Sequence, residues 1–122
     1  MFRPRHVVPP RQWAFRIADI LEAIAKIEKY TRGMDLASFA ADDKTVDAVV
    51  RNLVVVGEAA RHIPAEIEQA HPEVPWNEMR GIRNVVVHEY FGVSVPILWE
   101  TVARDLRPLV EPLRRIIASG KG

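Results

Sequence analysis

Apolar residues recur at helical spacing near the start of the chain. The stripe begins at Trp13 and continues through Ile17, Ile20, Leu21, Ile24 and Ile27. Steps of three and four residues place these side chains on one face of an α-helix. Prolines precede the stripe at positions 9 and 10, and Gly33 follows it, as is typical of the start and the end of a helix. The pattern therefore predicts a long helix that begins near Trp13 and ends before Gly33.

A second helical stripe lies in the middle of the chain. It comprises Val46, Val49, Val50, Leu53, Val54 and Ala60. Asp42 or Asp43 is expected to cap this helix, because an aspartate oxygen accepts hydrogen bonds from the free backbone N–H groups. The linker before it has room for a turn of helix after Asp35. A short helix is predicted after Pro64, running toward His71, and the prolines of "HPEVP" then break the chain twice.

A third apolar stripe occupies the last quarter of the chain. Ser94 followed by Pro96 is typical of a helix start. The apolar positions behind it are Ile97, Leu98, Val102, Leu106, Leu109, Leu113, Ile116 and Ile117. Pro108 and Pro112 fall inside this stripe, so the helix is expected to bend or break there. With the segment from Trp76 onward, the pattern predicts an all-α fold, an up-and-down bundle of four main helices plus a short extra helix.

The octet "RNVVVHEY", residues 83–90, does not follow this pattern. Three consecutive valines favour a strand. The octet has no alternation of apolar and polar residues, however, and a lone strand among helices has no partner. A helix is therefore predicted, ending near Gly92, with tertiary packing supplying what helix propensity lacks.

Composition narrows the class of protein. A chain of 122 residues with 48% hydrophobic and 27% charged residues fits one globular domain. It has no cysteine, which excludes disulfides and cysteine–zinc sites and fits a cytoplasmic protein. No apolar run is long enough to span a membrane, and the basic start carries no apolar segment of a signal peptide. His6, His62 and His71 show no metal-ligand spacing with His88 or with paired carboxylates, so no metal or other cofactor is expected.

Charge is balanced overall but unevenly distributed. The net charge is +1, so the chain as a whole has no strong attraction to nucleic acid. Residues 1–16 contain four arginines and no acid, residues 35–73 contain eight acids against three bases, and residues 100–122 are basic again. This polarity suits RNA at one end and a charged partner at the other, or it reflects only solvated helix faces.

The polar residues of the octet suit phosphate chemistry. Arginine binds phosphate oxygens through two N–H groups, and histidine exchanges protons near neutral pH. At about 100° per residue, Asn84 lies one helical turn before His88 and could orient its ring, whereas Arg83 and His88 point about 140° apart. One straight helix therefore does not aim both at a common point, but a two-fold dimer or an unwound turn could. The alternative is a surface ion pair for Arg83 and an interface role for His88.

Several segments, in order, carry a family resemblance. They are "RIADILEAIAKIEKYTRGM", "FAADDKTVDAVVRNLVVVGEAARHIP", "HPEVPWNEMRGIRNVVVHEYFGV" and "ILWETVARDLRPLV". The octet has arginine, four residues, histidine, one residue and tyrosine. These segments resemble the HepT-like toxins of the HEPN superfamily, helical ribonucleases of type VII toxin–antitoxin systems. The resemblance covers about residues 11–118, leaving residues 1–10 as an N-terminal extension and residues 119–122 as a C-terminal tail.

The resemblance implies a role for each residue of the motif. Arg83 and His88 match the two catalytic residues of the superfamily, and Asn84 matches the polar residue that usually follows the arginine. Tyr90 matches the tyrosine that an MntA-like nucleotidyltransferase antitoxin modifies with AMP. The implied protein is a homodimeric, metal-independent endoribonuclease that acts on RNA and contacts no membrane. The alternative is a non-catalytic helical binding partner of a nucleotidyltransferase.

A patch of small residues, "GEAA" at positions 57–60, raises a second question. Small side chains allow two helices to approach closely, so the patch fits a helix crossing or a dimer seam. The alternative is a functional role in which Glu58 holds Arg83 or a group of the RNA. The tryptophans at positions 13, 76 and 99 are expected to anchor the core or a seam.

Overall fold

The computed structural model describes residues 12–89 and 95–120. The helices in this part of the chain are α1 (Gln12–Thr31), α2 (Leu36–Ala40), α3 (Asp43–Ala60), α4 (Ala65–Ala70), α5 (Trp76–Glu89), α6 (Val95–Glu100) and α7 (Arg107–Gly120), with a π-helical segment, η1 (Thr101–Asp105), between the last two. No strand occurs in the two described ranges. The predicted all-α class is therefore confirmed.

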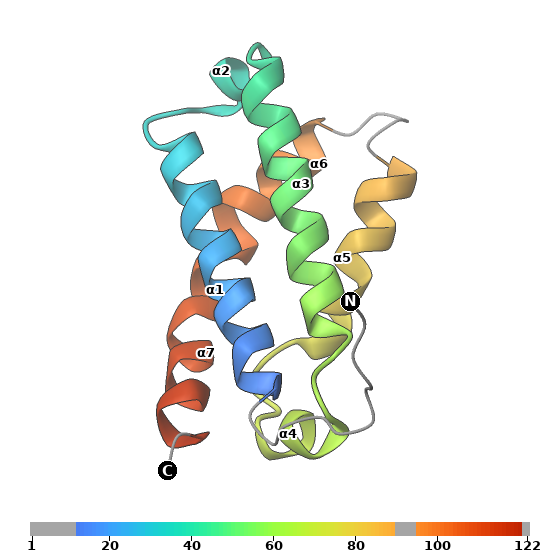
Figure 1. Ribbon diagram of the computed structural model, residues 1–122. Helices are drawn as coiled ribbons and strands as arrows, with labels where there is room; N and C mark the ends of the chain where they lie inside the picture. The colour runs from blue at the N-terminus through green and yellow to red at the C-terminus, as the bar shows by residue number, and fades with distance from the viewer. Residues whose placement is uncertain (1–11, 90–94, 121–122) are drawn as a thin grey trace, which may run out of the picture.

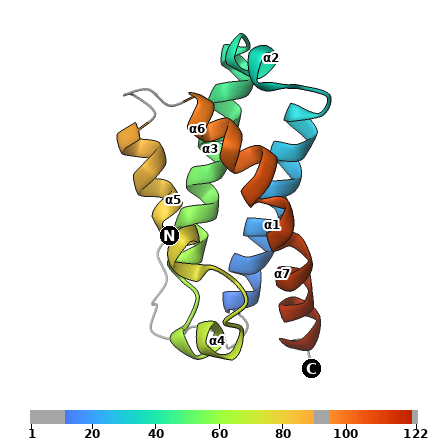
Figure 2. The ribbon, with the colours of Figure 1, turned by 180° about the vertical axis from the view of Figure 1, so that it is seen from behind.

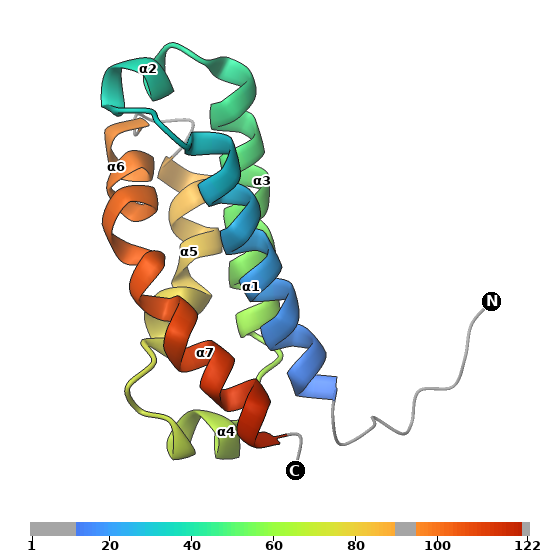
Figure 3. The ribbon, with the colours of Figure 1, turned by 90° about the vertical axis from the view of Figure 1, so that its left-hand side faces the viewer.

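The long elements alternate in direction, as an up-and-down bundle requires. Figure 1 shows α3 between α1 and α5, with α1 and α5 running upward and α3 running downward. The chain then descends through α6, η1 and α7 (Figure 2, from behind). Seen from the side, α7 lies along α1, and α4 closes the lower end (Figure 3). The short helix α4 follows Pro64 as predicted, and α2 occupies the linker in which the sequence left room for a turn of helix after Asp35.

The core is built from the predicted stripes. Its buried side chains on the first two long helices are Ile17, Ile20, Ala23, Ile24, Ile27, Val46, Val49, Leu53, Val56, Ala59 and Ala60. The last helices add Leu98, Leu106, Leu109, Leu113 and Ile116. Trp76 is buried, Trp13 and Trp99 are partly buried against the core, and the Trp99 ring lies 5.1 Å from that of Phe39. The expected anchoring roles of the tryptophans are thus confirmed.

Helix ends follow the predicted local signals. The Asp42 side chain accepts a hydrogen bond of 3.1 Å from the backbone N–H of Thr45 and caps α3. Asp35 and Ser38 form a reciprocal capping box at α2. These backbone bonds lower the pKa of both aspartates, because a donated N–H stabilises the charged carboxylate. Gly33, after α1, has a φ of 79°, a left-handed conformation that glycine adopts without strain.

The last helix breaks one turn before the position of its first proline. The backbone N–H of Leu106 donates to the carbonyl of Thr101, five residues earlier, at 3.2 Å. A proline lacks the N–H and its ring collides with the carbonyl four residues before it, which for Pro108 belongs to Arg104. The π-helical turn relieves this conflict, and α7 then continues through Pro112 without interruption. The predicted break is confirmed for Pro108.

The octet 83–90 is helical as far as Glu89, the last residue of α5. The choice of helix over strand is therefore confirmed. Tyr90, Gly92 and Ser94 lie outside the described residues, and so do the side chains of Val85, Val87, His88 and Glu89. Within the described ranges, the structure contains no helix with the length and apolarity needed to cross a membrane.

Candidate active site on helix α5

Helix α5 has one face in the core and one face toward solvent. Met79 and Val86 are buried, whereas Asn84 is exposed and Arg83 is partly exposed. Helix α3 provides the main support of α5, because a mostly apolar cavity of about 620 Å³ separates α5 from η1 and α7. The position of the polar residues of α5 is therefore set chiefly by its crossing with α3.

The crossing of α3 and α5 is closest at Gly57. A Cβ atom at this position would lie 2.9 Å from both the Cβ and the backbone nitrogen of Arg83. Non-bonded contacts of a Cβ atom are essentially never this short in proteins, so any other residue at position 57 would force the two helices apart. The interpretation of the small-residue patch as a helix crossing is confirmed, and the residue that it meets is the arginine of the motif.

The neighbouring residue, Glu58, pairs with the same arginine. Its Oε2 atom lies 2.8 Å from Nε of Arg83, and both side chains are 41% exposed. The same oxygen lies 3.4 Å from Nη1 of Arg61, at the C-cap of α3. Two guanidinium groups thus share one carboxylate at the surface where α3 and α5 cross. The contact between Glu58 and Arg83 matches the alternative considered from the sequence, in which Glu58 holds Arg83.

The predicted site residues occupy one helix. Arg83, Asn84 and His88 all belong to α5, with Asn84 one turn before His88. The hydrogen bond between Asn84 and His88, and the convergence of Arg83 and His88 in a dimer, remain predictions. Arg61 was not singled out from the sequence as part of this site. Its signal was present, since three residues along a helix place Arg61 beside Glu58.

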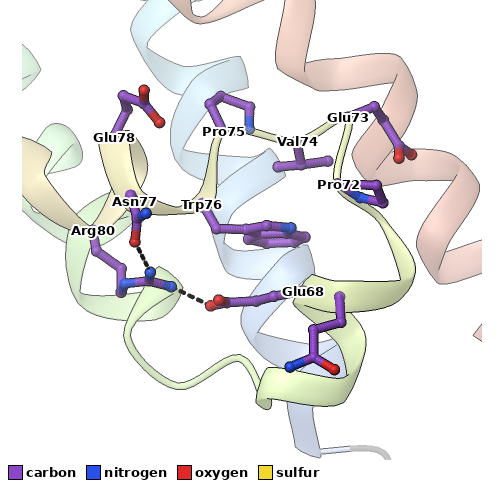
Figure 4. A pocket seen from close by; sticks show the side chains of 10 residues that line it. Glu68, Pro72, Glu73, Val74, Pro75, Trp76, Asn77, Glu78 and Arg80 are labelled. Carbon is purple, nitrogen blue, oxygen red and sulfur yellow. Dashed lines mark hydrogen bonds and ion pairs between the residues drawn. The ribbon is translucent and has the colours of Figure 1, made fainter.

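A separate polar pocket of about 510 Å³ lies at the start of α5, and side chains that line it connect α5 to α4. Figure 4 shows Arg80 bridging from α5 to Glu68 of α4, with Asn77 as its second partner. The indole N–H of Trp76 donates to the carbonyl of His71 at 3.0 Å. These contacts tie the first turn of α5 to α4 and leave the octet to be positioned by α3.

Among the side chains that the structure describes, no group of three or more histidine, aspartate or glutamate residues is placed to hold a metal ion. His71 instead pairs with Glu73, with its Nδ1 atom 3.7 Å from a carboxylate oxygen. The described side chains at the crossing of α3 and α5 offer two guanidinium groups, those of Arg61 and Arg83, around one carboxylate, and α5 also contains His88.

Comparison with known families shows the family to which the chain belongs. The model of the family described as "Ribonuclease HepT-like" matches residues 20–116, a span that includes the whole octet. The chain belongs to the HepT-like ribonuclease family. The resemblance seen in the sequence is thus confirmed, and with it the family assignment of the bundle.

Relatives of this HepT-like chain point the same way. "Probable ribonuclease HepT" of Thermococcus cleftensis is 45% identical over 93 residues, covering 76% of this chain and 84% of the relative. A protein of Caldanaerobacter subterraneus subsp. tengcongensis is 33% identical over 102 residues, 84% of this chain and 91% of its own length. One from Methanocaldococcus jannaschii is 35% identical over 104 residues, 85% and 86% of the two chains. The names of the last two give RNase as a provisional activity. No solved structure matches the chain significantly.

Proposed function

We propose that this chain is a metal-independent endoribonuclease, the toxin of a cytoplasmic toxin–antitoxin pair. The observation that carries the proposal is the placement of Arg83. Its stem is seated against Gly57, its guanidinium is paired with Glu58, and it shares α5 with His88. Membership of the HepT-like ribonuclease family and the RNase names of three relatives support the same activity.

The proposed reaction uses the 2′-hydroxyl of RNA as its nucleophile. Arg83 binds the non-bridging oxygens of the scissile phosphate and stabilises the charge that develops in the transition state. His88 accepts the proton of the 2′-hydroxyl as its oxygen bonds to phosphorus. The bond from phosphorus to the 5′ oxygen breaks, and that oxygen takes a proton from an imidazolium. The products are a 2′,3′-cyclic phosphate and a 5′-hydroxyl.

A homodimer would supply the second imidazole and complete the cleft. Arg83 and His88 are five positions apart on one continuous helix, so about 140° separates their directions. A two-fold axis near the octet would bring Arg83 of one copy toward His88 of the other. Light scattering should therefore give about twice the 13.8 kDa mass of one chain. A monomer at micromolar concentration would contradict the shared cleft.

The partner of the toxin, in this proposal, is an MntA-like nucleotidyltransferase that transfers AMP to Tyr90. Seven positions separate Arg83 from Tyr90 in the sequence, a spacing close to two turns of an ideal α-helix. The added phosphate would compete with RNA for Arg83, and the adenosine would occupy space that RNA needs. Tyr90→Phe should remain toxic and escape the antitoxin. If the partner, supplied with ATP and magnesium, modifies Tyr90→Phe as fully as the wild type, Tyr90 is not the switch.

Expression in a bacterial host tests the activity itself. Wild-type protein should arrest growth and fragment the RNA pool, whereas His88→Ala, expressed to the same level, should do neither. The comparison also separates the toxin from the non-catalytic alternative. A pure binding partner of a nucleotidyltransferase would give the same growth and the same RNA pool with either residue at position 88.

A further inference from the structure

The place of Glu58 is only partly explained by the stability of its own helix, where it pairs with Arg61 at the C-cap. Glu58 lies in the last turn of α3, a turn that contains no basic residue. Backbone carbonyl groups give the C-terminal end of a helix a partial negative charge, which disfavours a carboxylate there. The ion pair with Arg83 is also too exposed to stabilise the fold much, because solvent screens charges at a surface. A role in the site offers a better account of this residue.

Glu58 contacts the guanidinium of Arg83 on the side nearest the stem of the arginine side chain. The closest contact of Glu58 is with Nε, the nitrogen next to the side-chain stem. Arginine has five N–H donors in a planar fork, and phosphate binds best to two parallel donors at once. A carboxylate at Nε restricts rotation of the guanidinium plane, and the edge formed by the two terminal nitrogens is the second edge with which an arginine can bind a phosphate. Gly57 fixes the other end of the side chain, because its missing Cβ admits the backbone and Cβ of Arg83.

The carboxylate does not reverse the charge of the site. Arg61 binds the same Oε2 atom, so one negative group is surrounded by two guanidinium groups. The cluster of Glu58, Arg61 and Arg83 therefore keeps a net positive charge and still attracts a phosphodiester. An acid close to an RNA-binding arginine would otherwise weaken the binding of a polyanion.

We propose that Glu58 is a positioning residue, which orients the guanidinium of Arg83 toward the scissile phosphate of RNA. The proposal rests on the ribonuclease activity proposed above. Glu58 touches no reacting atom, and it acts by holding Nε of Arg83 while the terminal nitrogens bind phosphate. The effect of Glu58 is expected on the stability of the transition state. There the guanidinium must be aligned with the charge that develops on the phosphate, and its presence alone is not sufficient.

Kinetics on purified protein test this role. Glu58→Gln should lower kcat for RNA cleavage by about 10- to 100-fold, as misalignment of a catalytic group does. KM should stay the same or fall, because the variant loses a negative charge near RNA. The affinity for an uncleavable RNA analogue, in which each 2′-hydroxyl is replaced by a 2′-methoxy group, should follow KM. Glu28→Gln is the matched control, since Glu28 pairs with Arg107 across α1 and α7, and it should leave both constants unchanged.

Nitrogen-15 NMR of the arginine side chains gives a readout that is independent of cleavage. The Nε–H signal of Arg83 should move to the position of a free arginine in Glu58→Gln and stay unchanged in Glu28→Gln. An Arg83 signal that ignores Glu58→Gln would overturn the proposal, and so would a shifted signal with an unchanged kcat. If the wild type cleaves no RNA, the proposed function fails, and the Nε signal still decides whether Glu58 holds Arg83.

Discussion

Two helix crossings in this protein carry the same kind of ion pair, with different constraints. At the crossing of α3 and α5, Glu58 contacts Arg83 at Nε, and Gly57 receives the stem of the arginine. At the crossing of α1 and α7, Glu28 contacts only the outer nitrogen of Arg107, at 3.2 Å from each carboxylate oxygen, and the arginine is 75% exposed. The side chain of Arg83 is thus in contact at its stem and at Nε, whereas Arg107 pairs with Glu28 through one terminal nitrogen.

The two crossings differ in what lies beneath the ion pair and not in the kind of pair. Exposed ion pairs contribute about 0–1 kcal/mol to stability, whichever helices they join. What distinguishes Arg83 is the close backbone approach beneath it, which limits the directions that its side chain can take. The two crossings can therefore be compared directly by parallel substitutions, which should differ in activity much more than in stability.

The largest difference is expected from removal of the two arginines. Arg83→Ala should lower the rate of RNA cleavage by at least about 10²-fold, because the group that binds the phosphate and its developing charge is lost. Arg107→Ala should retain the wild-type rate. Both variants should unfold at nearly the wild-type urea concentration. Equal rates for the two variants would remove the functional distinction between the crossings.

A smaller difference, in stability, is expected when either of two glycines, Gly57 of α3 or Gly81 of α5, is replaced by alanine. Gly57→Ala should lower the free energy of unfolding by about 1–3 kcal/mol, because its Cβ overlaps the backbone of Arg83. Gly81→Ala, on α5, has no atom within 4 Å of the new Cβ and should raise stability by up to about 1 kcal/mol through helix propensity. Urea unfolding followed by circular dichroism measures both. A stabilising Gly57→Ala would show that the crossing is not tight.

The smallest effect concerns the cap of α3, at the end of the helix far from Glu58. The pKa of Asp42 is lowered, first of all by the backbone N–H of Thr45, so its charged form stabilises the folded state. This contribution is present above the ordinary carboxyl pKa of 3.8 and is lost as the pH falls below it. Asp42→Asn keeps an acceptor that does not titrate, so its melting temperature should fall less on acidification than that of the wild type. Identical pH profiles would show that the cap contributes nothing through its charge.

Much of the fold could be predicted from the sequence because its signals are local. The isoleucine stripe of α1, the aspartate cap of α3 and the conflict around Pro108 each depend on a few neighbouring residues. The helical state of the octet was also predictable, since three valines without a partner strand must pack as a helix. Local rules were sufficient for these elements.

The site was less predictable, because it depends on two helices meeting. Arg83 could be singled out by its type and motif as a candidate for binding phosphate, and this role stays a prediction. That Gly57 lies against its Cβ, and that Arg61 joins it on Glu58, depends on how α3 crosses α5, which no spacing within one helix specifies. From the sequence, contact between Glu58 and Arg83 was only one of the alternatives. The crossing of α3 and α5 shows that Glu58 pairs with Arg83 as well as with Arg61.

The central claim is that side chains of α5, without a metal, cleave RNA through its 2′-hydroxyl. The most direct test is cleavage of a short defined RNA by purified protein in excess EDTA, with analysis of the product ends. We expect undiminished cleavage that leaves 2′,3′-cyclic phosphate and 5′-hydroxyl ends, and no cleavage by Arg83→Ala or His88→Ala under the same conditions. Cleavage that stops in EDTA and returns with a divalent ion, or products with 5′-phosphate ends, would contradict it.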